Sequence, residues 1–248
     1  MSTNDTPLLA AGLFIKKYTT TTTKETKMTQ QEKDTLQAKL KSTPSLLTRK
    51  PLKEYSVLVP IVELGGKKHF LFQLRSQYVR QAGEISFPGG ERENEDADLE
   101  QTAIRECIEE LGVARSKIEV IGHIGKVYPN LAMCIDSYLG YLKINSLDEL
   151  KPDTYEVEKL FVLSFEFFAH NPATIYHAQT LSRNYKLDKN GDKVITFPSK
   201  ELKLPEIYNE EWGHNDYKIY AYDTPYGLLW GLTSFILQEV IGVVDLRG

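Results

Sequence analysis

The 248-residue sequence contains few residues of the kinds that make disulfide or zinc scaffolds: two cysteines, Cys107 and Cys134, and five histidines. A fold held by several disulfides is excluded, and neither thiol has a histidine at zinc-finger spacing. Two free thiols are typical of a reducing interior. We therefore take the cytoplasm as the default location, with organellar import through the N-terminal tail left open.

The sequence also lacks long hydrophobic runs and any excess of positive charge. No run approaches the length of a membrane span, and residues 8–15, the longest apolar N-terminal stretch, lack the features of a signal peptide. The formal net charge is -4, which is not typical of a nucleic-acid-binding protein. We expect neither a membrane nor a nucleic acid as a partner.

The threonine-rich N-terminus predicts a tail that precedes the folded domain. Residues 1–27 include five consecutive threonines with mainly Lys, Ser and Thr around them, which favours a disordered or dispensable segment. Residues 28–54 are expected to form a helix capped by Thr29 and Glu32, ended by Pro44 and followed by a linker. One domain is expected over residues 55–248.

Apolar patterns within that domain predict alternating strands and helices. Strands are expected at residues 57–62, 69–74, 118–127, 137–144 and 159–163. Residues 165–222 look longer and less regular, apart from a hairpin turn at 188–192 centred on Asn190-Gly191. An amphipathic helix is expected at residues 228–240. The order indicates an α/β fold.

Residues 91–110 carry nine acidic residues against two arginines, Arg92 and Arg105. On a helix at 100° per residue, one face is apolar: Ile104, Cys107, Ile108 and Leu111. Glu106, Glu109 and Glu110 gather on the opposite face within about a 100° arc. Gly112 then provides a left-handed end to the helix.

Three carboxylates on one helix patch repel one another, and no lysine follows them within the helix. A solvated acidic face would be the ordinary interpretation of the three residues alone. A divalent cation would relieve the repulsion, and oxygen ligands favour Mg²⁺ or Mn²⁺. Such an ion can neutralise charge on a phosphate and activate a water molecule.

The combination of Gly89-Gly90 with this helix resembles the Nudix box, whose second half is complete from Arg105 to Val113. The first half differs, because Asp96 stands at the position of the first glutamate and eight residues separate it from Arg105. The resemblance implies an α/β/α sandwich with a mixed sheet. It also implies a metal site at Glu106, Glu109 and Glu110, with Arg105 beside them and glycines that let backbone approach the site.

An upstream segment resembles the coenzyme A diphosphatase branch of this family. Arg75-Ser76 and Arg80 precede Gly83 and the Phe87-Pro88-Gly89-Gly90 sequence, with one residue fewer than the branch pattern before Gly83. Arg75 and Arg80 could bind substrate phosphates, or they could pair with the acidic loop. Glu156 follows the central strands and could be a base, a further ligand or a surface carboxylate.

The resemblance implies hydrolysis of coenzyme A or its derivatives to adenosine 3′,5′-bisphosphate and 4′-phosphopantetheine. One alternative is a Nudix pyrophosphatase for ADP-ribose, NADH or another nucleoside diphosphate derivative. Another is a non-catalytic binding module, although such a module would be expected to have lost box carboxylates. The partner is then a small nucleotide, and a homodimer is the default expectation.

Overall fold

The computed structural model describes residues 28–41, 52–130, 132–244 and 246. Contacts divide the chain into two units, residues 1–47 and residues 48–248. In the first unit, Gln30–Lys41 form helix α2. Its predicted capping box is confirmed, because the Thr29 N–H donates to Glu32 Oε2 (2.8 Å) and the Glu32 N–H donates to Thr29 Oγ1 (3.2 Å). Pro44 lies outside the described residues.

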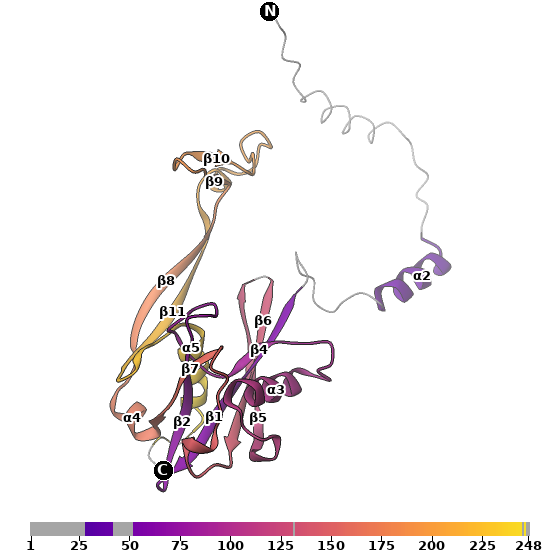
Figure 1. Cartoon of the computed structure of the whole chain (residues 1–248). Coiled ribbons are helices and arrows are strands. Elements are labelled where there is room, and N and C mark those ends of the chain that lie inside the picture. Colours follow the sequence, from indigo (N-terminus) through magenta and orange to yellow (C-terminus); the bar gives the residue numbers. More distant parts are fainter. Residues whose placement is uncertain (1–27, 42–51, 131, 245, 247–248) are drawn as a thin grey trace, which may run out of the picture. The chain divides into compact units, whose positions relative to one another are not determined.

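Seven strands of the second unit form a mixed sheet, as predicted (Figure 1). They are β1 (Lys53–Leu64), β2 (Lys67–Arg75), β3 (Ile85–Ser86), β4 (Gly89–Glu91), β5 (Ile118–Asn130), β6 (Met133–Leu142) and β7 (Val157–Ser164). The order β3-β2-β1-β6-β5 forms the body of the sheet, while β4 pairs with β1 and β7 with β2. Only the β1–β6 pair is parallel among these strand pairs of the described chain.

Helix α3 (Leu99–Leu111) covers one face of the sheet. Ala103, Ile104, Cys107 and Leu111 of the helix are buried against β-strand residues that include Leu58 and Leu71. Ile108 is only partly buried. The apolar side predicted for the helix therefore anchors it, and the carboxylates are held by a rigid element.

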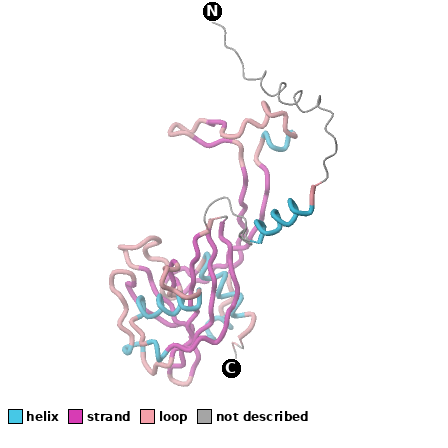
Figure 2. Tube along the Cα trace, turned by 90° about the vertical axis from the view of Figure 1, so that its right-hand side faces the viewer, coloured by secondary structure: helices cyan, strands magenta, loops and turns pink. Residues whose placement is uncertain are grey.

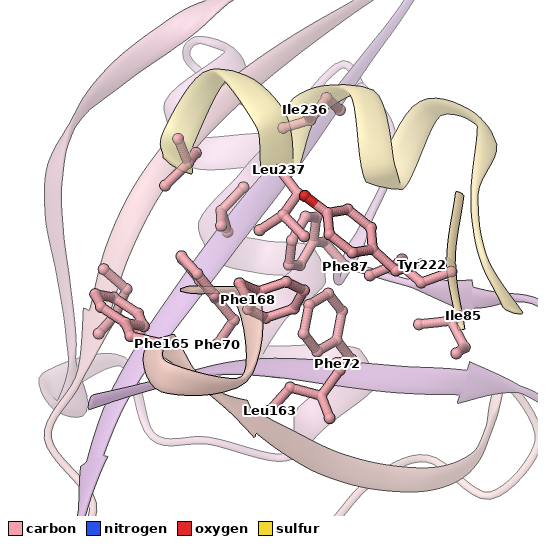
Figure 3. Packing of buried hydrophobic residues seen from close by; sticks show 14 of the residues in the cluster. Phe70, Phe72, Ile85, Phe87, Leu163, Phe165, Phe168, Tyr222, Ile236 and Leu237 are labelled. Atoms are coloured by element: carbon pink, nitrogen blue, oxygen red, sulfur yellow. The ribbon is translucent and has the colours of Figure 1, made fainter. Parts of the chain in front are cut away.

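The opposite face carries helices α4 (Phe165–His170) and α5 (Gly231–Ile241). Figure 3 shows Phe70 and Phe72 of β2 in one apolar cluster with Phe168 of α4 and Leu237 of α5. The Phe70 ring stacks on that of Phe165 at 4.5 Å between centroids. The two apolar layers give the predicted α/β/α sandwich.

The prediction of a less regular segment at residues 165–222 is wrong for much of its length. Strands β8 (Thr174–Ser182) and β11 (Trp212–Thr224) pair as a long antiparallel ribbon that leaves the body of the domain (Figures 1 and 2). The ribbon carries β9 (Tyr185–Leu187) and β10 (Lys193–Ile195) at its far end. The predicted turn between them is confirmed, since the Asp188 N–H donates to the Asp192 carbonyl (2.9 Å). The ribbon pattern was missed because β8 is exposed on both faces, so its sequence does not alternate between apolar and polar residues.

The last helix begins later than predicted. Leu228 and Leu229 belong to β12 (Gly227–Leu229), which pairs with the end of β11, and α5 starts at Gly231. Apolar residues continue from the strand into the helix, so periodicity did not separate them. Among the described residues, no helix is long and apolar enough to cross a membrane.

Candidate active site

Helix α3 has strong local start and stop signals. The Asp98 side chain caps the N-terminus by accepting from the Gln101 N–H (2.9 Å). Gly112 ends the helix at φ 63°, and a Cβ at this position would overlap the Lys151 backbone. The three box glutamates therefore lie in the last two turns of a helix whose ends are set by its own sequence.

Glu110 does not lie on the exposed patch that the helical wheel suggests. The residue is 2% exposed and accepts hydrogen bonds from Gln73 Nε2 (3.0 Å) and from the Gly89 N–H (2.8 Å). Burial raises the pKa of Glu110 to about 8, against the opposing effect of both hydrogen bonds. The helical wheel gives only the direction in which a side chain points. Glu110 is buried because Gln73 of β2 and Gly89 of β4 lie in that direction.

Glu106 points at the backbone of Gly90 and has only 13% of its side chain exposed. A Cβ built on Gly90 would lie 2.6 Å from Glu106 Oε2 and even closer to Oε1. Burial raises the pKa of Glu106, and the charges of Glu109 and Glu156 act in the same direction. This carboxylate is therefore held between the Arg105 guanidinium and the Gly90 backbone of β4.

Arg105 bridges the two more accessible carboxylates of the helix. Its Nη1 lies 2.9 Å from Glu106 Oε1 and 2.9 Å from Glu109 Oε2, and the Glu109 side chain is 57% exposed. Within the described residues, no three His, Cys, Asp or Glu side chains converge as they would around a metal ion. Glu106 and Glu109 share Arg105, while Glu110 is turned toward Gly89.

Asp96 anchors the acidic loop to the helix. Its carboxylate accepts from Arg105 Nε (3.0 Å), from Thr102 Oγ1 (2.9 Å) and from the Glu93 N–H (3.0 Å). The Arg105 guanidinium holds the pKa of Asp96 at about 2. Asp96 thus orients the arginine that contacts Glu106 and Glu109. In the sequence, the only sign of this role of Asp96 was that an aspartate stands where the family pattern has a glutamate.

We expect Asp96→Asn to lower the free energy of unfolding at neutral pH by roughly 1–3 kcal/mol, because a buried, charge-assisted hydrogen bond is weakened. The pKa of Asp96 is depressed in the folded state, so the ion pair stabilises the protein above pH 3.8, and that stabilisation is lost as pH falls toward about 2. Denaturant unfolding at several pH values measures both effects. Asp98→Asn is the control, since Asn caps a helix as well as Asp. An Asp96→Asn defect independent of pH would contradict this account.

Gly89 and Gly90 let β4 approach its neighbours closely. Gly89 pairs with Val57 and Gly90 with Ser56 of β1. A Cβ on Gly89 would overlap the Ser56 carbonyl and lie 2.6 Å from Val57 Cγ1. The two glycines therefore place the β4 backbone between β1 and the carboxylates of α3.

Arg75 is the last residue of β2, and Arg80 lies on the tight loop that follows it. The loop closes through hydrogen bonds from the Gly83 N–H to the Arg75 carbonyl (2.9 Å) and from the Arg75 N–H to the Glu84 carbonyl (3.0 Å). Arg75 Nε donates to the Arg80 carbonyl (2.9 Å). Neither arginine has an ion pair within the described part of the chain, where Arg92 and Arg105 contact the acidic loop instead. Pairing of Arg75 or Arg80 with that loop is therefore not observed.

Two further residues bear on the predicted set: Gln73, which the sequence analysis missed, and Glu156, which it named as a possible base or ligand. Gln73 is fully buried in β2 and binds Glu110, and Glu156 lies near enough to Glu106 to raise its pKa. The Glu156 carbonyl accepts from the Ser76 N–H (2.9 Å), which ties this segment to the arginine loop. Gln73 was missed because it stands in a strand pattern far from the box in sequence.

The NUDIX domain family model matches residues 53–183 of this chain, which include β4, α3 and the arginine loop. This chain belongs to the Nudix family. The Nudix match ends inside the arm formed by β8 and β11, so the distal arm lies beyond it.

Curated relatives fall in the same family. The mouse peroxisomal coenzyme A diphosphatase NUDT7 is 36% identical over 51% of this chain and 52% of its own length. The mouse mitochondrial coenzyme A diphosphatase NUDT8 is 37% identical over 44% and 53%. Nudix hydrolase 3 of Caenorhabditis elegans is 26% identical over 77% and 72%. The chain spans about half the length of the two coenzyme A diphosphatases.

Proposed function

We propose that this Nudix chain is a metal-dependent hydrolase that cleaves the diphosphate of coenzyme A or a derivative, releasing adenosine 3′,5′-bisphosphate and 4′-phosphopantetheine. The observation that carries the proposal is the convergence of Glu106 and Glu110 on the Gly89-Gly90 backbone. The arginine loop that follows β2 supports the substrate class, as do relatives named as coenzyme A diphosphatases.

The donors around this backbone suit Mg²⁺ or Mn²⁺. They are carboxylate oxygens only, and two of them, from Glu106 and Glu110, lie against the Gly89-Gly90 backbone. Glu106, Glu109 and Glu110 would hold the ion. When bound, it would neutralise charge on the diphosphate and activate a water molecule.

The protein's own side chains have separable roles in this proposal. Arg105 orients Glu106 and Glu109, and Asp96 orients Arg105. Glu156 is our candidate for the group that accepts a proton from the attacking water, because it lies close to Glu106 and is only partly buried. Arg75 and Arg80 bind phosphate oxygens of the substrate.

The purified chain should be incubated with Mg²⁺ or Mn²⁺ and, separately, with coenzyme A, ADP-ribose, NADH and a dinucleoside polyphosphate, with products identified by mass spectrometry. Preferred cleavage of coenzyme A, abolished by a chelator, supports the proposal. If another diphosphate were preferred, the assignment of a Nudix hydrolase reaction would stand, but the assignment of coenzyme A as substrate would be rejected. A folded protein that binds metal and hydrolyses none of them would favour the binding-module alternative.

Arg80→Ala is expected to raise KM for coenzyme A roughly tenfold, since one charge-assisted hydrogen bond to a phosphate is lost, and to leave kcat nearly unchanged. Arg80 is exposed and its backbone carbonyl, not its side chain, holds Arg75, so the loop should persist. Steady-state kinetics measure the effect. Arg183→Ala on the arm is the matched control, and an equal rise in KM there would remove the role assigned to Arg80.

A further inference from the structure

The arm formed by β8 and β11 is a two-stranded ribbon with little support from the rest of the domain. Eight of the nine residues of β8 are exposed, and only Ala178 is partly buried. Support comes at the base, where Ala221 and Tyr222 of β11 are buried. An isolated two-stranded ribbon is at best marginally stable in water, so a further strand beside it would stabilise this arm.

One edge of that ribbon is open and unprotected. In the order β12-β11-β8, strand β8 is terminal, so its outer edge pairs with no strand among the described residues. Its sequence, Thr-Ile-Tyr-His-Ala-Gln-Thr-Leu-Ser, contains no Lys, Arg, Asp, Glu or Pro. Proteins normally block exposed edges with charge, proline or bulges, because unpaired backbone groups template further pairing.

The same protein blocks the edge of its main sheet. Strand β5 is terminal there and carries three register irregularities against β6. It also contains Glu119, Lys126 and Pro129. Strand β8 has neither charge nor proline, and its one register irregularity, opposite Thr180 and Ser182, places the extra residue on β11, away from the open edge. We therefore read this edge as one that pairs.

The sequence of β8 is self-complementary about its central residue, Ala178. Antiparallel pairing with an identical strand about this residue sets Ile175 opposite Leu181 and Tyr176 opposite Thr180. His177 then faces Gln179, and the hydroxyl residues Thr174 and Ser182 face each other. Centring on His177 would instead oppose Ile175 to Gln179. The Ala178 register pairs all nine residues of the strand and sets its two aliphatic residues, Ile175 and Leu181, opposite each other.

We propose that two copies of this chain dimerise through β8, antiparallel about a two-fold axis at Ala178, into a continuous four-stranded sheet ordered β11-β8-β8-β11. The pairing satisfies the open edge of both copies. It also buries side chains that are 49% (Ile175) and 43% (Leu181) exposed in one chain. The interface lies on the arm and is independent of the function proposed for the carboxylate site.

The self-pairing of Ala178 allows a decisive test. Size-exclusion chromatography with light scattering on the full-length chain should give twice the mass of one chain. Ala178→Lys and Ala178→Glu should each elute as monomers, because like charges meet at the two-fold axis. An equimolar mixture of the two variants should regain the dimer mass, since opposite charges then face each other, and this rescue excludes simple misfolding.

Val194→Lys, on an exposed strand at the end of the arm, is the control and should remain dimeric. Diphosphate hydrolysis by all variants should match the wild type, so failure of the proposed function is visible separately. A monomeric wild type at micromolar concentration would overturn the proposal, as would a dimeric Ala178→Lys. Monomeric single variants that fail to recombine, or open-ended wild-type assemblies, would overturn the Ala178 register.

Discussion

Replacing Glu106 with Gln should lower kcat roughly 10²- to 10³-fold, the range found when one electrostatic contact to the developing charge is removed. The side chain is held between Arg105 and the Gly90 backbone, so the amide keeps the shape but loses the charge that would bind a divalent ion. Thermal stability should change little, since burial already disfavours the charged form of Glu106. Kinetics at saturating substrate and metal, with parallel unfolding curves, measure both quantities.

Glu100→Gln is the matched control for Glu106→Gln, because it makes the same chemical change in the first turn of the same helix. It should leave kcat unaltered. If Glu106→Gln retained wild-type kcat, the carboxylate cluster of α3 would not be the site of catalysis. A proportional fall in both variants would indicate an effect of helix charge in general rather than of this position.

Gly90→Ala should produce an inactive protein that remains folded. The added Cβ overlaps the end of the flexible Glu106 side chain, which must move away from β4. A displacement of about 1 Å in a catalytic group can cost roughly 10²-fold in rate. Circular dichroism and thermal unfolding should resemble those of the wild type while hydrolysis of coenzyme A is lost.

Two other glycines calibrate this result. Gly122→Ala should leave both activity and stability unchanged, because an added Cβ at this position meets no atom within 4 Å. Gly89→Ala should instead lower stability, since its Cβ would overlap the Ser56 backbone carbonyl and disturb the β1–β4 pairing. Gly90→Ala with full activity would show that the position of Glu106 over β4 does not matter for turnover.

Local patterns predicted the elements that bring the site together. The apolar spacing of Ile104, Cys107 and Leu111 anchors α3 as expected, and Gly112 ends it. The strands predicted before and after the box are present as β1, β2, β5, β6 and β7. Such features depend on residues within one or two turns of each other, so one sequence contains the necessary information.

The arm and the start of α5 were mispredicted because their patterns are not set by a core. Strand β8 and the part of β11 beyond its buried base pair with each other while remaining largely exposed, so apolar alternation is weak along them. Residues 228–229 are apolar in β12 and the residues of α5 are apolar again, which conceals the boundary. Periodicity indicates an element only where one of its faces is buried.

By itself, the sequence determined the family, the α/β class and the helix that carries three carboxylates, because these follow from spacing along one segment. Tertiary structure alone decided that Glu110 is buried against Gln73, 37 residues away, and that Asp96 holds Arg105. It alone placed the Gly90 backbone against Glu106 and left the edge of β8 open. The physical reason is that burial and desolvation depend on neighbours from other segments, and these neighbours set which carboxylate is charged and which edge can pair.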